Sequence, residues 1–171
     1  MNSDSAPEIV YSEDQAENKR FVAGGHYSEQ NLAGTNLSGL RLSKANFSNA
    51  NLSGCQMRGA VLDEVNLSNA VLDNANLELA VLGAANLKQA SIKNANLKRA
   101  NLVGVNAVAA DFSGSDFYYS RPGNGNFENA VFANAKIERA IFRRANLRHA
   151  DMRGATGQAN FENADTEGLR Q

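Results

Sequence analysis

The sequence predicts an all-β solenoid in which four-sided coils stack on one another. Three observations support this fold class: a large apolar residue returns every five positions from Leu32, a small residue precedes most of these by two positions, and asparagine returns every twenty positions from Asn46. A five-residue period fits neither the 3.6 residues of a helical turn nor the alternation of a strand. A backbone that turns a corner every five residues explains it.

The large apolar residues, here called centres, follow one another in an unbroken series. They are Leu32, Leu37, Leu42, Phe47, Leu52, Met57, Leu62, Leu67, Leu72, Leu77, Leu82, Leu87, Ile92, Leu97, Leu102, Ala107, Phe112 and Phe117. All except Ala107 are large, so we expect the centres to fill the axis while the small residues let the corners close. Coils stacked at the strand spacing of about 4.8 Å would hydrogen-bond to their neighbours.

A second period appears in the residue directly before each centre. One set, separated by twenty positions, is Asn46, Asn66, Asn86, Asn106, Asn126 and Asn146. The branched residues at this position fall on two other sides: Val61, Val81 and Ile141 on one, Val71 and Val131 on the opposite one. A twenty-residue period within a five-residue period indicates coils with four sides.

The repeated pattern Ala-(Asn/Asp)-Leu-x-x, as in "NANLELAVLGAANLKQA", resembles the pentapeptide-repeat family. The resemblance runs from Gln30 to Gly154, which makes it specific for a repeat architecture. It implies a right-handed quadrilateral β-helix in which centres and small residues point inward.

Four segments are predicted. Residues 1–10 are expected to be a disordered tail, and residues 11–29 an N-terminal cap with a short helix from about Glu13 to Val22, because Ser12 and Gln15 form a capping-box pattern. Residues 30–155 form the repeat β-helix. Residues 156–171 form a C-terminal cap or tail, because Gly157 falls where a centre should lie and the regular spacing slips there.

Pro122 also occupies a centre position, within "YYSRPGNGNF". Proline lacks the N–H that a stacked coil needs. The asparagine period continues through Asn126 and Asn146, so we expect a bulged corner that keeps the register.

Composition excludes several functional classes. The formal net charge is −1, and the single cysteine, Cys55, occurs at an inward small position. The sequence has no secretory signal and no long apolar run, which predicts a cytoplasmic protein that does not enter a membrane. Residues 30–155 hold nine acidic and fourteen basic residues, whereas both flanking segments are acidic.

No catalytic, cofactor or metal site is predicted, so the chain is not expected to be an enzyme. His26 and His149 lie many coils apart, and the adjacent Asp63 and Glu64 are expected to be solvated. Cys55 is expected to be a buried filler without an accessible thiolate.

One predicted side of the solenoid concentrates the residues that are enriched in protein interfaces. The expected partner-binding residues are Leu79, Lys98, Arg99, Tyr118, Tyr119, Arg121 and Arg139. The alternative is that the two tyrosines only cover the bulge at Pro122. The sequence leaves both open.

The predicted function is therefore a non-catalytic, rigid scaffold for a protein partner. The alternative is binding of a topoisomerase. The family resemblance implies this function, because proteins of this family bind DNA gyrase through a DNA-like shape and charge. That mimicry needs a strongly negative rod, which the basic repeat region lacks. Nucleic-acid binding is not expected, since the basic residues wind around all four sides.

A homodimer through the end of the last regular coil, near Phe142, Leu147 and Met152, is also possible. The alternative is that residues 156–171 cap this coil.

Overall fold

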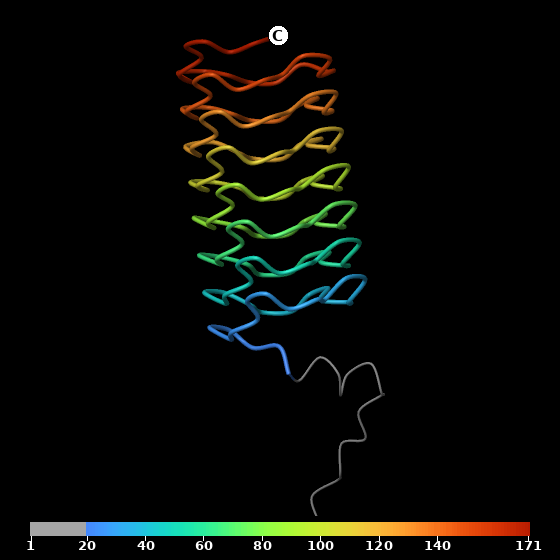
Figure 1. The fold of residues 1–171 in the computed structure, drawn as a ribbon. Coiled ribbons are helices and arrows are strands. Elements are labelled where there is room, and N and C mark those ends of the chain that lie inside the picture. The colour runs from blue at the N-terminus through green and yellow to red at the C-terminus, as the bar shows by residue number, and fades with distance from the viewer. Residues whose placement is uncertain (1–19) are drawn as a thin grey trace, which may run out of the picture.

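The computed structural model describes residues 20–171, which wind into one straight rod of stacked coils (Figure 1). The described residues contain neither helices nor extended strands, and hence no helix of the length and apolarity needed to cross a bilayer. Each side of a coil instead pairs with the coils below and above through single-residue parallel bridges.

These bridges join positions twenty residues apart, from His26–Asn46 to Lys136–Thr156. The Asn46 N–H donates to the Gly25 carbonyl below at 2.8 Å, and the Phe47 N–H donates to the Asn66 carbonyl above at 2.8 Å. Four five-residue sides therefore make one coil. The twenty-residue period and the stacking of the asparagines are confirmed.

Asparagine recurs before the centres because its side chain closes the turn that follows. The Asn46 Oδ1 accepts the Ser48 N–H at 3.0 Å, and the Asn66 Oδ1 accepts the Ser68 N–H at 3.1 Å. The Asn86 amide also donates to the Asn66 Oδ1 at 3.2 Å, which links successive coils. Short polar side chains that bond to nearby backbone favour such turns over helix or strand.

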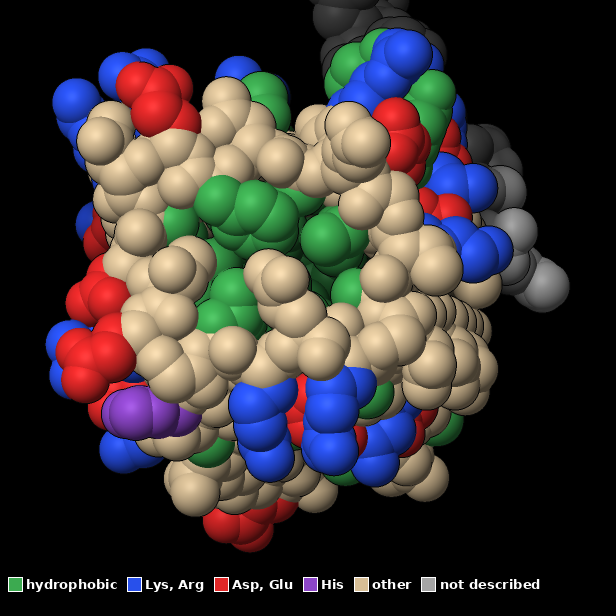
Figure 2. All heavy atoms as spheres, turned by 90° about the horizontal axis from the view of Figure 1, so that it is seen from above, with side chains coloured by type: hydrophobic (Ala, Val, Ile, Leu, Met, Phe, Trp, Pro, Cys, Tyr) green, Lys and Arg blue, Asp and Glu red, His purple; other side chains and the backbone are tan. Residues whose placement is uncertain are grey.

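The centres and the small residues form one continuous apolar core along the axis. Figure 2, which looks down the rod from its C-terminal end, shows apolar side chains in the middle and charged side chains around the perimeter. Cys55 is fully buried there, as predicted, and burial raises the pKa of its thiol. From Phe112 onward the core becomes rich in phenylalanines whose rings contact one another in stacked, tilted and edge-on geometries.

At the N-terminal end, two aromatic residues cover the first coil. Tyr27 is the first centre, five residues before Leu32, and its ring stacks on Phe47 with a centroid distance of 4.8 Å. Phe21 packs on Tyr27 at 5.1 Å. The predicted tail at residues 1–10 and most of the predicted helix lie outside the described residues, and the described end of that helix, Arg20 to Val22, is not helical.

Pro122 fits into the repeat without an inserted residue. It is buried at its centre position, and the bridges Asn106–Asn126 and Asn126–Asn146 continue on the neighbouring side. The predicted register is confirmed. The predicted bulge is wrong, since no residue is inserted, and the disturbance is limited to a missing bridge between Arg121 and Ile141. The adjacent bond from the Ile141 N–H to the Ser120 carbonyl, 3.0 Å, holds the coil although Pro122 has no N–H to donate.

The ladders continue beyond residue 155, where the sequence predicted the regular helix to end. The last bridges join positions nineteen residues apart: Ile141–Asn160, Asn146–Asp165 and Asp151–Arg170. One side of this last coil is therefore a residue short. Phe161, one position earlier than a period of five would place a centre, lies on Phe142 at a centroid distance of 5.4 Å.

The last coil also buries Phe142, Leu147 and Met152, so these residues offer no dimer surface. The half-buried Phe161 and Leu169 are among the apolar side chains of the last coil. Self-association there stays a prediction.

Ion pairs attach the last coil to the one below. Arg143 contacts Glu162 at 3.4 Å, and Arg148 contacts Glu167 at 2.6 Å. The Asp151 carboxylate binds Arg153 through two bonds of 2.9 and 2.6 Å and Arg170 of the last coil at 3.3 Å. Such paired geometry is the strongest form of arginine–carboxylate contact.

We expect the stability of this end to fall in acid because of Asp151. The hydrogen bonds from Arg153 are the main cause that lowers the pKa of Asp151 to about 2. The pKa of an aspartate in the unfolded chain is about 3.9. The contribution of Asp151 to the free energy of unfolding is therefore complete above that pH and is lost as the pH falls toward about 2. Urea unfolding of the wild type and Asp151→Asn should therefore differ at pH 6 and converge near pH 2. A difference that stays constant with pH would contradict this.

Candidate functional site

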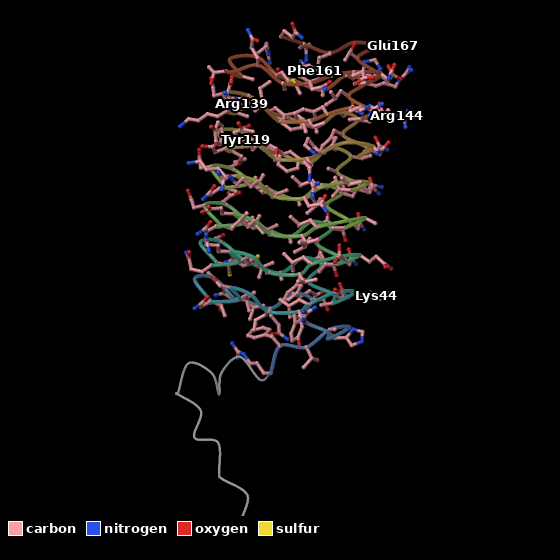
Figure 3. All side chains as sticks on the ribbon, turned by 180° about the vertical axis from the view of Figure 1, so that it is seen from behind. Lys44, Tyr119, Arg139, Arg144, Phe161 and Glu167 are labelled. Atoms are coloured by element: carbon pink, nitrogen blue, oxygen red, sulfur yellow. The ribbon has the colours of Figure 1, made fainter. Side chains whose placement is uncertain are left out.

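The candidate site lies on the side of the rod whose centres are Leu77, Leu97, Phe117 and Ile137, here called the tyrosine face. The positions two after these centres stack at one corner and form the corner ladder, which consists of Leu79, Arg99, Tyr119 and Arg139. Figure 3 shows Arg139 directly above Tyr119 at one edge of the rod. All four side chains are exposed to solvent.

The two tyrosines and Arg139 form one connected cluster. The Arg139 guanidinium lies over the Tyr119 ring, 5.0 Å from its centroid, and donates a hydrogen bond to the Tyr119 hydroxyl. Tyr118 meets Tyr119 edge-on, with centroids 4.7 Å apart. Cation–π and edge-to-face contacts of this kind hold aromatic side chains in place at a surface.

The corner ladder uses large side chains where the backbone favours small ones. Its four members have left-handed φ angles of 60, 57, 56 and 59°. The equivalent positions of the preceding side are filled by residues that tolerate this conformation, namely Asn74, Asn94, Gly114 and Asn134. Each large side chain here costs about 1 kcal/mol. Large residues such as Gln89 and Arg144 also adopt this conformation on other sides, but there their neighbours one coil away are smaller. The succession of four large residues makes this corner the candidate contact surface.

Arg99→Asn should therefore stabilise the protein by about 0.5–1 kcal/mol, because asparagine adopts the left-handed conformation more readily. Arg144→Asn is the matched control: Arg144 has a φ of 57° on another face and lies at the opposite edge of the rod (Figure 3). Equilibrium urea unfolding should show a similar gain for both variants. A loss of stability in either variant would contradict the strain argument.

A groove of about 370 Å³ runs along the tyrosine face beside the corner ladder. It is lined by Lys98, Asp116, Tyr118, Lys136, Glu138, Thr156 and Gly157. All of them except Gly157 belong to two ladders, one directly before and one directly after the centre positions. The groove reaches the short side of the last coil at Gly157, where a turn residue is missing.

The structure brings most of the predicted site residues together. Lys98 and Tyr118 line the groove, and Leu79, Arg99, Tyr119 and Arg139 form the corner ladder. Arg121 lies apart, exposed at the start of the next face, where it pairs with Asn101 of the coil below. Since no bulge exists at Pro122, the tyrosines have none to cover.

Sequence reasoning missed the other wall of the groove, formed by Asp116, Lys136 and Thr156. A signal was available, because these residues succeed one another at intervals of twenty directly before the centres. Their side chains are acidic, basic and neutral in turn, so they did not stand out in the linear sequence.

The described residues contain no group of three or more histidine, cysteine, aspartate or glutamate side chains that could hold a metal ion. His26 lies in the first coil and His149 near the other end of the rod. The core side chains on the axis are almost completely buried. The groove on the tyrosine face, with the corner ladder beside it, is the candidate site.

Comparisons with known proteins agree with this architecture. The family model for pentapeptide repeats matches in eight copies, over residues 28–63, 60–91, 80–117 and 126–156. A structure of QnrB1, a plasmid-mediated fluoroquinolone resistance protein, is similar with 18% identity over 85% of this chain and 72% of that one, and a TM-score of 0.53.

HetL, a pentapeptide repeat protein involved in heterocyst differentiation regulation from the cyanobacterium Nostoc sp. strain PCC 7120, has 19% identity over 85% of this chain and 90% of that one, with a TM-score of 0.38. A search of curated proteins gave no significant match. At these identities the likeness to QnrB1 extends to the fold alone.

Proposed function

The chain belongs to the pentapeptide-repeat family, and we propose that it is a rigid, non-catalytic scaffold that binds a protein partner through the tyrosine face. The observation that carries this proposal is the corner ladder, where four large side chains persist at left-handed positions. Selection for folding alone favours glycine or asparagine there. Selection for a contact surface explains arginine, tyrosine and leucine.

The chemistry of the ladder supports a protein partner. Tyrosine and arginine are enriched among the residues that contribute most to protein interfaces. The cluster of Tyr118, Tyr119 and Arg139 is already ordered by its own contacts. The solenoid backbone beneath it is fixed by hydrogen bonds to the coils on both sides. Little conformational entropy is then lost on binding, which favours affinity.

Replacing Tyr118 and Tyr119 together by serine should reduce capture of the partner at least about tenfold, because central aromatic residues of an interface contribute about 2 kcal/mol or more. The measurement is a quantitative pull-down from lysate of the source organism. Lys88→Ser with Gln89→Ser is the matched control, since these residues occupy the same two positions on another face. Capture that is equal for the tyrosine variant and the wild type would remove the proposal.

The alternative function is binding of a topoisomerase such as DNA gyrase through a DNA-like shape. The fold likeness to QnrB1 supports the shape. Charge opposes it, because residues 30–155 carry fourteen basic against nine acidic residues, whereas a DNA mimic must present a negative surface. A supercoiling assay with purified gyrase separates the two functions, and the scaffold proposal expects no change in supercoiling.

A further inference from the structure

The groove beside the corner ladder shows which chemistry of partner would fit it, and this inference rests on the proposed function. Its two acidic residues are already engaged. Asp116 pairs with Lys98 at 3.4 Å. The Glu138 carboxylate accepts the Gln158 N–H at 2.8 Å and lies 3.7 Å from the Arg139 guanidinium.

The groups that remain available in the groove are donors. Within residues 20–171, Lys136 forms no ion pair, and its exposed ammonium lies between the Asp116 and Thr156 levels of the same ladder. The hydroxyls of Tyr118 and Thr156 form no hydrogen bond with another described residue. Arg99 at the adjacent corner likewise has no acidic partner in that part of the chain.

We infer that the groove binds an acidic segment of the partner protein, with a glutamate or aspartate carboxylate on Lys136 between the Tyr118 and Thr156 hydroxyls. A carboxylate can accept from an ammonium and two hydroxyls at once, and such charge-assisted bonds are stronger than neutral ones. The Tyr118 ring supplies an apolar wall for the methylene groups of the same side chain.

The charge pattern favours a protein over a nucleic acid. Lys136 is flanked by the fixed carboxylates of Asp116 and Glu138. A continuous phosphate backbone that reached Lys136 would pass both carboxylates and be repelled. A single carboxylate among neutral or basic residues meets that repulsion at one point only, where Lys136 offsets it, instead of along the whole bound segment. The same carboxylates favour a basic residue next to the bound acid in the partner segment.

A selection from random peptides tests this inference directly on the groove. A phage-displayed library is panned on the full chain, and selected peptides are synthesised for fluorescence anisotropy. We expect them to share a glutamate or aspartate. Replacing that residue by glutamine, or making Lys136→Gln in the protein, should each weaken binding about tenfold. Lys88→Gln, an exposed lysine on another face, should leave binding unchanged.

Charge reversal gives a stricter test. The Lys136→Glu variant should bind the acidic peptide still more weakly than Lys136→Gln does. It should instead bind a version of the peptide that carries lysine in place of the acid. Urea unfolding of each variant shows whether the rod is intact, and we expect no change because the Lys136 side chain is exposed.

The outcomes separate this inference from the proposed function. Peptides that depend on Tyr118 and Tyr119 but bind Lys136→Gln as well as the wild type would overturn the inference and leave the scaffold proposal standing. Selected peptides without a common acid, or displacement of the peptide by duplex DNA, would also overturn it. Failure to select any peptide that depends on the tyrosine face would count against both.

Discussion

Replacing Phe132 by alanine should lower the free energy of unfolding by about 3–5 kcal/mol, which is the usual loss for a buried phenylalanine. Phe132 contacts four other aromatic rings in the described core. Its ring centroid lies 5.2 Å from that of Phe112, 5.5 Å from Phe117, 5.6 Å from Phe127 and 5.6 Å from Phe142. A closed solenoid cannot collapse around the cavity, because every coil is fixed by backbone bonds to its neighbours.

Phe132→Leu is the matched control, since leucine fills most centres of the N-terminal half. We expect it to cost about 1 kcal/mol, because most of the apolar volume is kept. Urea unfolding monitored by circular dichroism gives both values. Hydrogen exchange then shows whether the coils around Phe132 open before the rest, as expected when each coil contacts only its neighbours. A loss below about 1 kcal/mol for alanine would contradict the packing argument.

The regular part of the fold could be predicted because each residue type acts at the same place in every coil. Centres such as Leu52 are buried, small residues such as Ala50 close the corners, and Asn46 and its successors bond to the next turn. Both periods follow from these local requirements. The twenty-residue period alone then predicts that Leu79, Arg99, Tyr119 and Arg139 share one corner.

The ends of the rod were harder to predict because they break the local rule. Phe21 lies one position before an expected centre, yet it is buried on Tyr27 while Val22 is exposed. Beyond Met152, a missing turn residue looked like the end of the repeat, although the ladders continue. In the sequence, the loss of one residue from a coil and the end of the repeat both break the five-residue period, so the period does not distinguish them. The backbone bonds of the neighbouring coil decide it.

The groove was missed for a related reason. Its walls come from two ladders, and one wall carries Asp116, Lys136 and Thr156, which share no chemical type. The tyrosines and arginines of the tyrosine face were predicted as a group because both residue types are enriched in protein interfaces. The groove also reaches Gly157 on the short side of the last coil, which no period in the sequence predicts.

Gly157→Ala should destabilise the last coil by about 3 kcal/mol, since left-handed strain and a backbone clash combine. Gly157 has a φ of 96°, and an added Cβ would lie 2.6 Å from the Glu138 nitrogen and 2.7 Å from its Cα. Gly104→Ala is the control: its φ is 70°, and no atom lies within 4 Å of the added Cβ. That change should cost about 1 kcal/mol from strain alone.

Hydrogen exchange locates the effect of this change. The Ile137, Arg139 and Phe142 amides donate to the last coil at 2.8, 2.7 and 2.8 Å, so they should exchange about a hundredfold faster in Gly157→Ala. The Leu82 amide, bonded to Asn101 in the middle of the rod, should stay protected. Equal costs for the two alanine variants would show that the last coil relaxes around residue 157. The short side would then be a flexible turn, and the groove that ends on it would lose its fixed upper boundary.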